Sequence, residues 1–234
     1  MLRAALASAL LTAAAACSAP PAADGGRAGD GWTDLFDGET LAGWRGFNGA
    51  PAPTSWRVTD GALHFAPTGT RGDLFAAGTY GDFELEAEWR VAPCGNSGIF
   101  YRTAEADGLD APWRTALEYQ VLDDACHPDG VYPSHRASAL YDLYVPAVAA
   151  ARPAGEWNRA RIVVQDGRVE HWLNGERVVQ AQIGSADWDA RVAASKFRDA
   201  AAFPGFGTYA AGAVGLQDHG DEVWYRSVRV RPLP

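Results

Sequence analysis

The sequence predicts an all-β protein, a sandwich or jelly roll of antiparallel strands with one short helix. Residues 82–91 alternate apolar and charged side chains, which is typical of a strand with one face in a core. The pairs Asp166-Gly167 and Asn174-Gly175 separate apolar runs and favour tight hairpins. Only residues 186–202 have helical spacing. Many short strands and one helix indicate a single β domain over residues 32–234.

The first half of the domain, up to residue 122, is predicted to contain several strands. Residues 55–65 indicate two short strands around Asp60-Gly61, and residues 97–102 and 116–122 indicate two more. In residues 82–91, Glu84, Glu86 and Glu88 share the face opposite the apolar residues. We interpret this acidic face as the solvated side of the sheet rather than as a metal site.

The second half predicts a meander of residues 158–165, 168–173 and 176–183. The expected helix at 186–202 ends at Pro204-Gly205, and a strand at 223–230 closes the domain.

The N-terminus resembles a secretory signal peptide over residues 1–17, with a basic start and an apolar stretch too short to span a bilayer. Cys17 follows four Ala and resembles the lipobox of bacterial lipoproteins, so we expect its lipidation; ordinary cleavage nearby is the alternative. Residues 18–31 are rich in Ala, Pro and Gly and predict a flexible linker. The expected location is the bacterial periplasm or outer membrane, with a lipid anchor as the only membrane contact.

Export makes Cys94 and Cys126 a candidate disulfide, with two separate buried thiols as the alternative. The net charge of −9 and the absence of a basic stripe exclude a typical nucleic-acid-binding surface. The nine Trp and eight Tyr suit a sandwich core, and aromatic faces also bind sugar rings.

Two polar sequences interrupt predicted strands and are candidates for a site. Glu118 and Gln120 lie two positions apart and share a face, and a bulge near Leu122 would bring Asp123 to them. This spacing is similar to the Glu-x-Asp-x-x-Glu of sandwich-fold glucanases, whose outer carboxylates act as nucleophile and acid. The Gln and the Asp here make that route weak, and an exposed polar face is the alternative.

The second sequence is residues 217–221, which we interpret as a continuing strand that turns Gln217 and His219 to the same pocket as Glu118 and Gln120. Histidine transfers protons near neutral pH, so His219 is the first candidate among the five His. The others are expected to be structural or surface residues: His64, His127, His135 and His171.

Four further residues complete the candidate set. Asn96 and Arg102 flank a predicted strand, Tyr141 would stack on a sugar or fill the core, and Lys196 would reach an anionic or carbonyl oxygen. All four are assigned to substrate binding, together with Gln120, Gln217 and Asp123.

An ordered set of motifs between about Gly31 and Arg231 resembles the 3-keto-disaccharide hydrolase family. The motifs are Trp32–Gly38, Leu41–Trp44, Asn96–Phe100, Glu118–Asp123, Leu140–Tyr144, Gly155–Asn158, His171–Gly175 and Gly215–Gly220. The resemblance implies a concanavalin-like or lectin-like jelly roll and cleavage of glycosides that carry a ketone at C3.

Such a ketone acidifies the C2 proton, so a base can form an enolate and expel the group at C1 before water adds back. Our hypothesis places His219 or Glu118 as that base, with the other assisting proton return. Gln120, Gln217 and Arg102 would orient hydroxyls or the enolate. A divalent metal is an alternative electrophile, with Glu118, Gln120 and His219 as candidate ligands. Two other functions stay open: a non-catalytic carbohydrate-binding lectin-like module and a structural or partner-binding domain.

Overall fold

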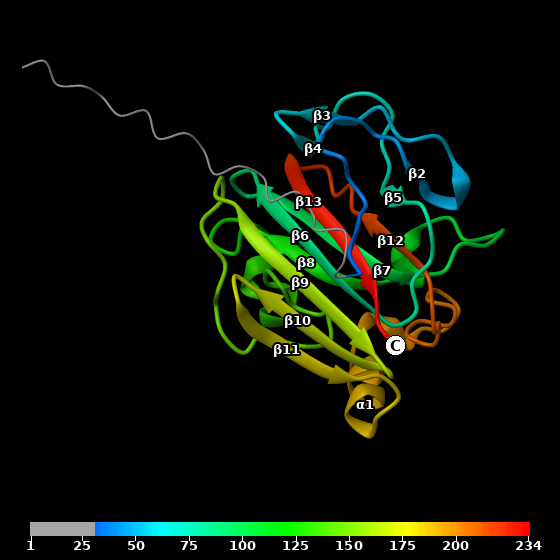
Figure 1. Cartoon of the computed structure of the whole chain (residues 1–234). Coiled ribbons are helices and arrows are strands. Elements are labelled where there is room, and N and C mark those ends of the chain that lie inside the picture. Colours follow the sequence, from blue (N-terminus) through cyan, green and yellow to red (C-terminus); the bar gives the residue numbers. More distant parts are fainter. Residues whose placement is uncertain (1–30) are drawn as a thin grey trace, which may run out of the picture.

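The computed structural model of the chain describes residues 31–234 as two antiparallel sheets with their apolar faces packed together (Figure 1). The predicted signal peptide, Cys17 and all but the last residue of the predicted linker lie outside the described residues. Within residues 31–234, no helix is long and apolar enough to cross a membrane.

The larger sheet has the strand order β11-β10-β9-β6-β13-β4-β3, with β1 beside β13, and the smaller has the order β2-β5-β12-β7-β8. The strands are β1 Thr33–Asp34, β2 Trp44–Gly46, β3 Trp56–Thr59, β4 Ala62–Phe65, β5 Leu74–Ala76, β6 Phe83–Val91, β7 Asn96–Thr103, β8 Leu117–Leu122, β9 Asn158–Gln165, β10 Arg168–Leu173, β11 Glu176–Gln182, β12 Ala213–Leu216 and β13 Val223–Pro232. The helices are α1 Ala186–Ala194 and the 3₁₀ turns η1 Phe47–Gly49, η2 Pro112–Arg114, η3 Pro128–Val131, η4 Pro133–His135 and η5 Lys196–Arg198.

The core between the sheets confirms the predicted alternation. Trp89 of β6 and Tyr119 of β8 are almost completely buried between the sheets. His171 of β10 lies in the same layer, where Tyr101 Oη is 2.8 Å from its Nε2 and the Ser138 carbonyl 3.0 Å from its Nδ1. Burial lowers the pKa of His171 to about 4, so the ring is neutral and structural, as expected.

The acidic face of β6 differs from the expectation of a solvated surface. Glu84 and Glu86 are buried, because arginines on both neighbouring strands cover them. Arg159 of β9 and Arg229 of β13 both donate to Glu86, at 2.7 Å each. Burial alone would raise the pKa of Glu86, but these two arginines outweigh it and hold the pKa below its usual range.

The helix predicted over residues 186–202 is shorter in the structure. The α-helix α1 ends at Ala194, and Ser195 has an extended backbone before the separate turn η5 begins. Ser195 Oγ donates to the Val192 carbonyl and accepts the amide of Phe197, so one hydroxyl ends the helix and starts the turn. This interruption sets the position of Lys196.

The predicted disulfide between Cys94 and Cys126 is present and closes a loop of sequence separation 32. It joins the start of β7 to the segment that follows β8. Asp123 organises the same loop, because its carboxylate accepts the amides of Cys94 at 2.8 Å and Ala125 at 3.2 Å.

We expect the double substitution Cys94→Ser and Cys126→Ser to lower the free energy of unfolding by about 3–4 kcal/mol, because the open chain gains loop entropy. Urea denaturation of the variant and of the wild type measures the difference. Reduced wild type serves as the control and should match the variant. Equal stability of the oxidised wild type and the variant would contradict the expectation.

Candidate active site

The candidate site lies on the face of the smaller sheet that points away from the larger sheet. Leu117, Tyr119 and Val121 of β8 enter the core, so the alternate residues Glu118 and Gln120 point outward. They open into a cavity of about 330 Å³. The cavity is lined by Asp73, Asn96, Trp113, Glu118, Gln120, Tyr141, Lys196, Gln217, Asp218 and His219. Seven of the nine residues predicted for the site therefore lie together.

Glycine at position 98 makes room for the Glu118 side chain. Gly98 of β7 pairs with Gln120 of β8, and a Cβ atom at position 98 would lie 2.4 Å from Oε1 of Glu118. Any side chain there would collide with the carboxyl group. The motif Asn-Ser-Gly on β7 thus forms the floor under the carboxyl group.

The segment 217–221 differs in backbone from the prediction of a continuing strand. Strand β12 ends at Leu216, although the amide of Gln217 still donates to the Gly98 carbonyl at 2.9 Å. The following residues form the loop that connects β12 of the smaller sheet to β13 of the larger sheet. Both Gln217 and His219 still line the cavity. The backbone prediction was therefore wrong, while the side chains meet Glu118 and Gln120 as predicted.

Glu118 has a strongly perturbed carboxyl group. Burial raises the pKa of Glu118 to about 8, although nearby Lys196 and the side-chain amide of Gln217 lower it. Lys196 Nζ lies 4.3 Å from the centroid of the Tyr141 ring, and the Lys196 amide donates to Asp142 at 3.0 Å. Burial in turn lowers the pKa of Lys196, so this side chain can exchange a proton more readily than a free lysine.

Asp73 is a second carboxyl group of the cavity that the sequence analysis missed. Burial raises the pKa of Asp73 to about 7, opposed by the amide of Asp218, which donates to Asp73 at 2.8 Å. The negative charge of Asp73 in turn raises the pKa of Glu118. Asp73 precedes the three-residue strand β5, which is too short to show a period in the sequence.

Two buried amide oxygens in the cavity have no hydrogen-bond partner among the described residues: Gln120 Oε1 and Gln217 Oε1. The Gln120 side-chain nitrogen already donates to Asn96 at 3.2 Å. Buried acceptors of this kind normally have a donor. Hydroxyl groups of a bound ligand would supply such donors.

Two predicted site residues do not line the cavity. Asp123 caps the disulfide loop, because no bulge turns it toward Glu118. Arg102 has a left-handed backbone with φ of 51° where the register of β7 and β12 shifts, and its side chain contacts Asp82 at 3.2 Å. Trp113, which was not predicted, lines the cavity from the 3₁₀ turn η2 before β8 and is 40% exposed.

The sequence suggested Glu118, Gln120 and His219 as metal ligands, but the structure brings a different set of potential ligands together. His219 lies with His127 and Asp221, and potential ligand atoms of the three are within 4.8 Å of one another. Two imidazoles and a carboxylate suit a divalent transition metal. However, Nδ1 of His127 accepts the amide of Asp129 at 3.1 Å, which places the proton of the neutral ring on Nε2. A metal would have to displace this proton or the amide contact, so these three residues do not fit a metal as they are arranged.

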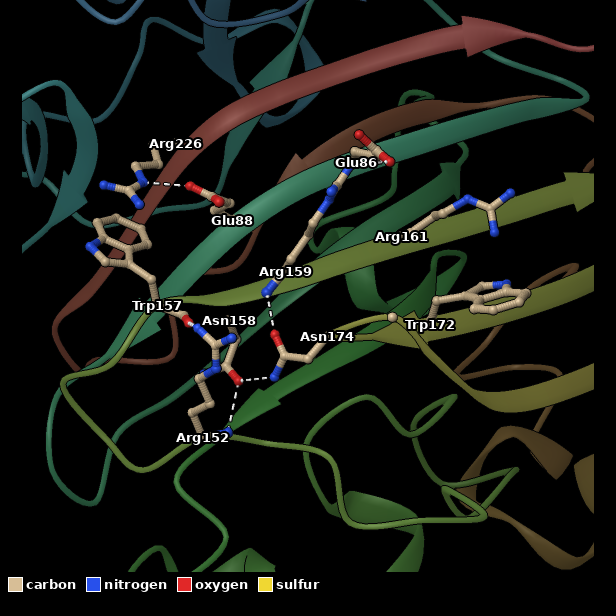
Figure 2. Close-up of a pocket in the computed structure, with 11 residues that line it drawn as sticks. Glu86, Glu88, Arg152, Trp157, Asn158, Arg159, Arg161, Trp172, Asn174 and Arg226 are labelled. Atoms are coloured by element: carbon tan, nitrogen blue, oxygen red, sulfur yellow. Dashed lines mark hydrogen bonds and ion pairs between the residues drawn. The ribbon is translucent and has the colours of Figure 1, made fainter. Parts of the chain in front are cut away.

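A larger depression of about 570 Å³ lies on the outer face of the larger sheet (Figure 2). Figure 2 shows Arg159 between Trp157 and Trp172. Its carboxylates, Glu86 and Glu88, are paired with arginines, and Asn158 Oδ1 accepts from the Asn174 side chain. Paired carboxylates are poor proton acceptors, so the smaller cavity around Glu118 is the better candidate for acid–base chemistry.

The comparisons with known proteins agree with this fold. Residues 31–231 match the 3-keto-alpha-glucoside-1,2-lyase-like domain family. A protein of Bacteroides thetaiotaomicron named 3-keto-disaccharide hydrolase is 39% identical over 230 residues, covering 87% of this chain and 79% of the relative.

Solved structures show the same architecture. A crystal structure from Parabacteroides distasonis, assigned provisionally to the glycosyl hydrolases, is 34% identical with a TM-score of 0.80, covering 87% of this chain and 94% of that chain. A Bacillus subtilis protein with a galectin-like fold shares the fold alone, at 14% identity and a TM-score of 0.54, covering 82% and 90%. The match over almost all described residues shows that the chain belongs to the 3-keto-alpha-glucoside-1,2-lyase-like domain family.

Proposed function

We propose that this protein cleaves the glycosidic bond of glycosides whose sugar carries a ketone at C3. One observation carries the proposal: Glu118 and Asp73, both with raised pKa values, share one cavity with Lys196 and with two unpaired amide oxygens. Carboxyl groups with pKa values near neutrality suit proton transfer at neutral pH. The family match and the name of the B. thetaiotaomicron relative support the same substrate class.

The first step is removal of the C2 proton. The ionised Glu118 carboxylate takes the proton, and the electron pair of the C–H bond forms an enolate with the ketone oxygen. Lys196, a cation that lines the same cavity, stabilises the negative oxygen. The amide oxygens of Gln120 and Gln217 accept hydrogen bonds from sugar hydroxyls and hold the ring in place.

The second step breaks the bond at C1. The enolate electrons form the C1–C2 double bond, and the leaving oxygen departs with its bonding electrons and takes the proton that Glu118 has accepted from C2. Addition of water, with hydroxyl at C1 and a proton at C2, completes hydrolysis. Release of the unsaturated ketone before this addition makes the same enzyme a lyase.

Carbohydrate binding without turnover is the second candidate. Trp113 exposes an aromatic face at the cavity, as lectin-like sites do. The perturbed carboxyl groups favour the enzyme, because a binding site needs no proton acceptor with a raised pKa.

Incubation with 3-keto-trehalose or a methyl 3-keto-glucoside, with and without a chelator, tests the proposal. In D₂O, elimination followed by hydration places deuterium at C2 of the released sugar, whereas direct hydrolysis leaves hydrogen there. Free 3-keto-glucose incubated with the enzyme controls for exchange next to the ketone. Binding without any product would refute the enzyme and support the lectin-like alternative.

We expect Glu118→Gln to lower kcat/KM by about 10²–10⁴-fold, because the amide keeps the shape but cannot accept the proton. Glu88→Gln is the matched control, since Glu88 lies on the outer face of the larger sheet and is paired with Arg226. Steady-state kinetics of both variants measure the effect. Equal rates for Glu118→Gln and Glu88→Gln would remove Glu118 from the mechanism.

The pH profile tests the direction of the Glu118 role. A base with a pKa of about 8 is mostly protonated at pH 7, so kcat/KM should rise with pH up to about 8. Lys196→Met removes a charge that lowers this pKa, so the rising limb should move to higher pH. Arg198→Met, an exposed change in the same turn, should leave the limb in place. A falling limb near pH 8 would instead show that Glu118 acts as an acid.

A further inference from the structure

A second cavity of about 460 Å³ adjoins the candidate active site on the same side of the smaller sheet. Asp73 lines both cavities, which makes them neighbours. Gly46, the last residue of β2, lines the second cavity, and β2 pairs with β5 in the sheet (Figure 1). Its lining comes from three segments: residues 46–53, 70–73 and 109–112.

The polar side chains of the second cavity are already bonded within the protein. Asn48 Nδ2 donates to the Leu109 carbonyl at 2.8 Å. Arg71 Nε donates to Asp218 at 2.6 Å, so its charge is neutralised by a carboxylate. Thr70 bonds to Thr54 and Asp110 to Arg114. This wall therefore presents few free hydrogen-bonding groups to a ligand.

Asp73 is the carboxyl group that this cavity shares with the active site, and the rest of the lining is glycine or apolar. Phe47 packs against Phe75 of β5 with the ring centroids 5.5 Å apart, and it stays partly exposed to the cavity. The other apolar residues of the wall are Ala50, Pro51, Pro53, Leu109, Ala111 and Pro112. The active-site cavity contrasts with this wall, because its amide oxygens have no partners.

We propose that the second cavity is the subsite for the leaving group, and that its preferred occupant is an aryl aglycone. This inference rests on the proposed function, because it assigns the two cavities to the two halves of one glycoside. The keto sugar takes the cavity with unpaired polar groups. The leaving group takes the wall whose polar groups are satisfied, where an aromatic ring loses no hydrogen bonds but sugar hydroxyls would lose theirs to water.

The two cavities thus select different features of the substrate. Unpaired buried polar groups reject a ligand that lacks the matching hydroxyl, often by large factors. An apolar wall selects by shape and area, and each contact contributes little. Recognition is therefore strict for the keto sugar and tolerant for the leaving group, with aromatic rings favoured by Phe47.

Three 3-keto-glucosides of one anomeric configuration test the subsite: methyl, phenyl and glucosyl. In Phe47→Ala, the phenyl-to-methyl ratio of kcat/KM should fall about tenfold, the factor that corresponds to 1.4 kcal/mol. Phe47→Leu should restore part of the ratio, because it returns apolar area. Val148→Ala is the control for loss of an exposed apolar side chain that lines neither cavity, and should leave the ratio unchanged.

The outcomes separate this inference from the proposed function. An equal fall for methyl and phenyl glycosides in Phe47→Ala would overturn the subsite, and a larger fall for the glucosyl compound would assign it to a second sugar instead of an aryl group. If wild type turns over none of the three, the proposed function fails. Calorimetric titration of phenyl and methyl 3-keto-glucoside into Glu118→Gln and into Glu118→Gln with Phe47→Ala still decides the subsite, because binding needs no turnover.

Discussion

The alternation of side chains along the smaller sheet is the constraint on which the site depends. Strand β8 commits every second residue to the core, and the packing of Tyr119 between the sheets fixes the direction of its neighbours Glu118 and Gln120. The residues that line the cavity on this outer face, among them Tyr141 and Gln217, then bury Glu118 and raise its pKa.

The protein buries carboxylates in two ways, on the outer faces of its two sheets. On the larger sheet, arginines on the strands beside β6 surround Glu84 and Glu86, so the charges are neutralised where they stand. On the smaller sheet, no arginine is paired with Glu118, and its nearby cation is Lys196. A bidentate guanidinium would hold the proton off a carboxyl group permanently, whereas a lysine with a lowered pKa leaves the group able to take one up. A glutamate paired with arginine is therefore structural in this protein, whereas the glutamate near Lys196 is available for proton transfer.

The sequence predicted the parts of the fold that rest on local patterns. The hairpins at Asp166-Gly167 and Asn174-Gly175, the alternation of β6 and the face shared by Glu118 and Gln120 all follow from residue type and a period of two. The sequence could not identify Asp73 as a site residue, because the adjoining strand β5 has only three residues and shows no alternation. Asp73 comes close to the site only because β5 pairs with β12, which is distant in the sequence. The helix prediction was too long, since the apolar spacing of 186–202 continues through Ser195 while its hydroxyl ends the helix. Arg102 and Asp123 were misplaced because a left-handed residue and a loop cap break the alternation.

The space above Gly98 links two positions of the chain. A methyl group at position 98 would overlap the Glu118 side chain, so that side chain would have to leave its present position while the sheet keeps its register. A residue larger than glycine at 98 therefore displaces the carboxyl group even when Glu118 is retained. In an aligned set of relatives, we expect glycine at 98 wherever the carboxyl group of 118 keeps this place.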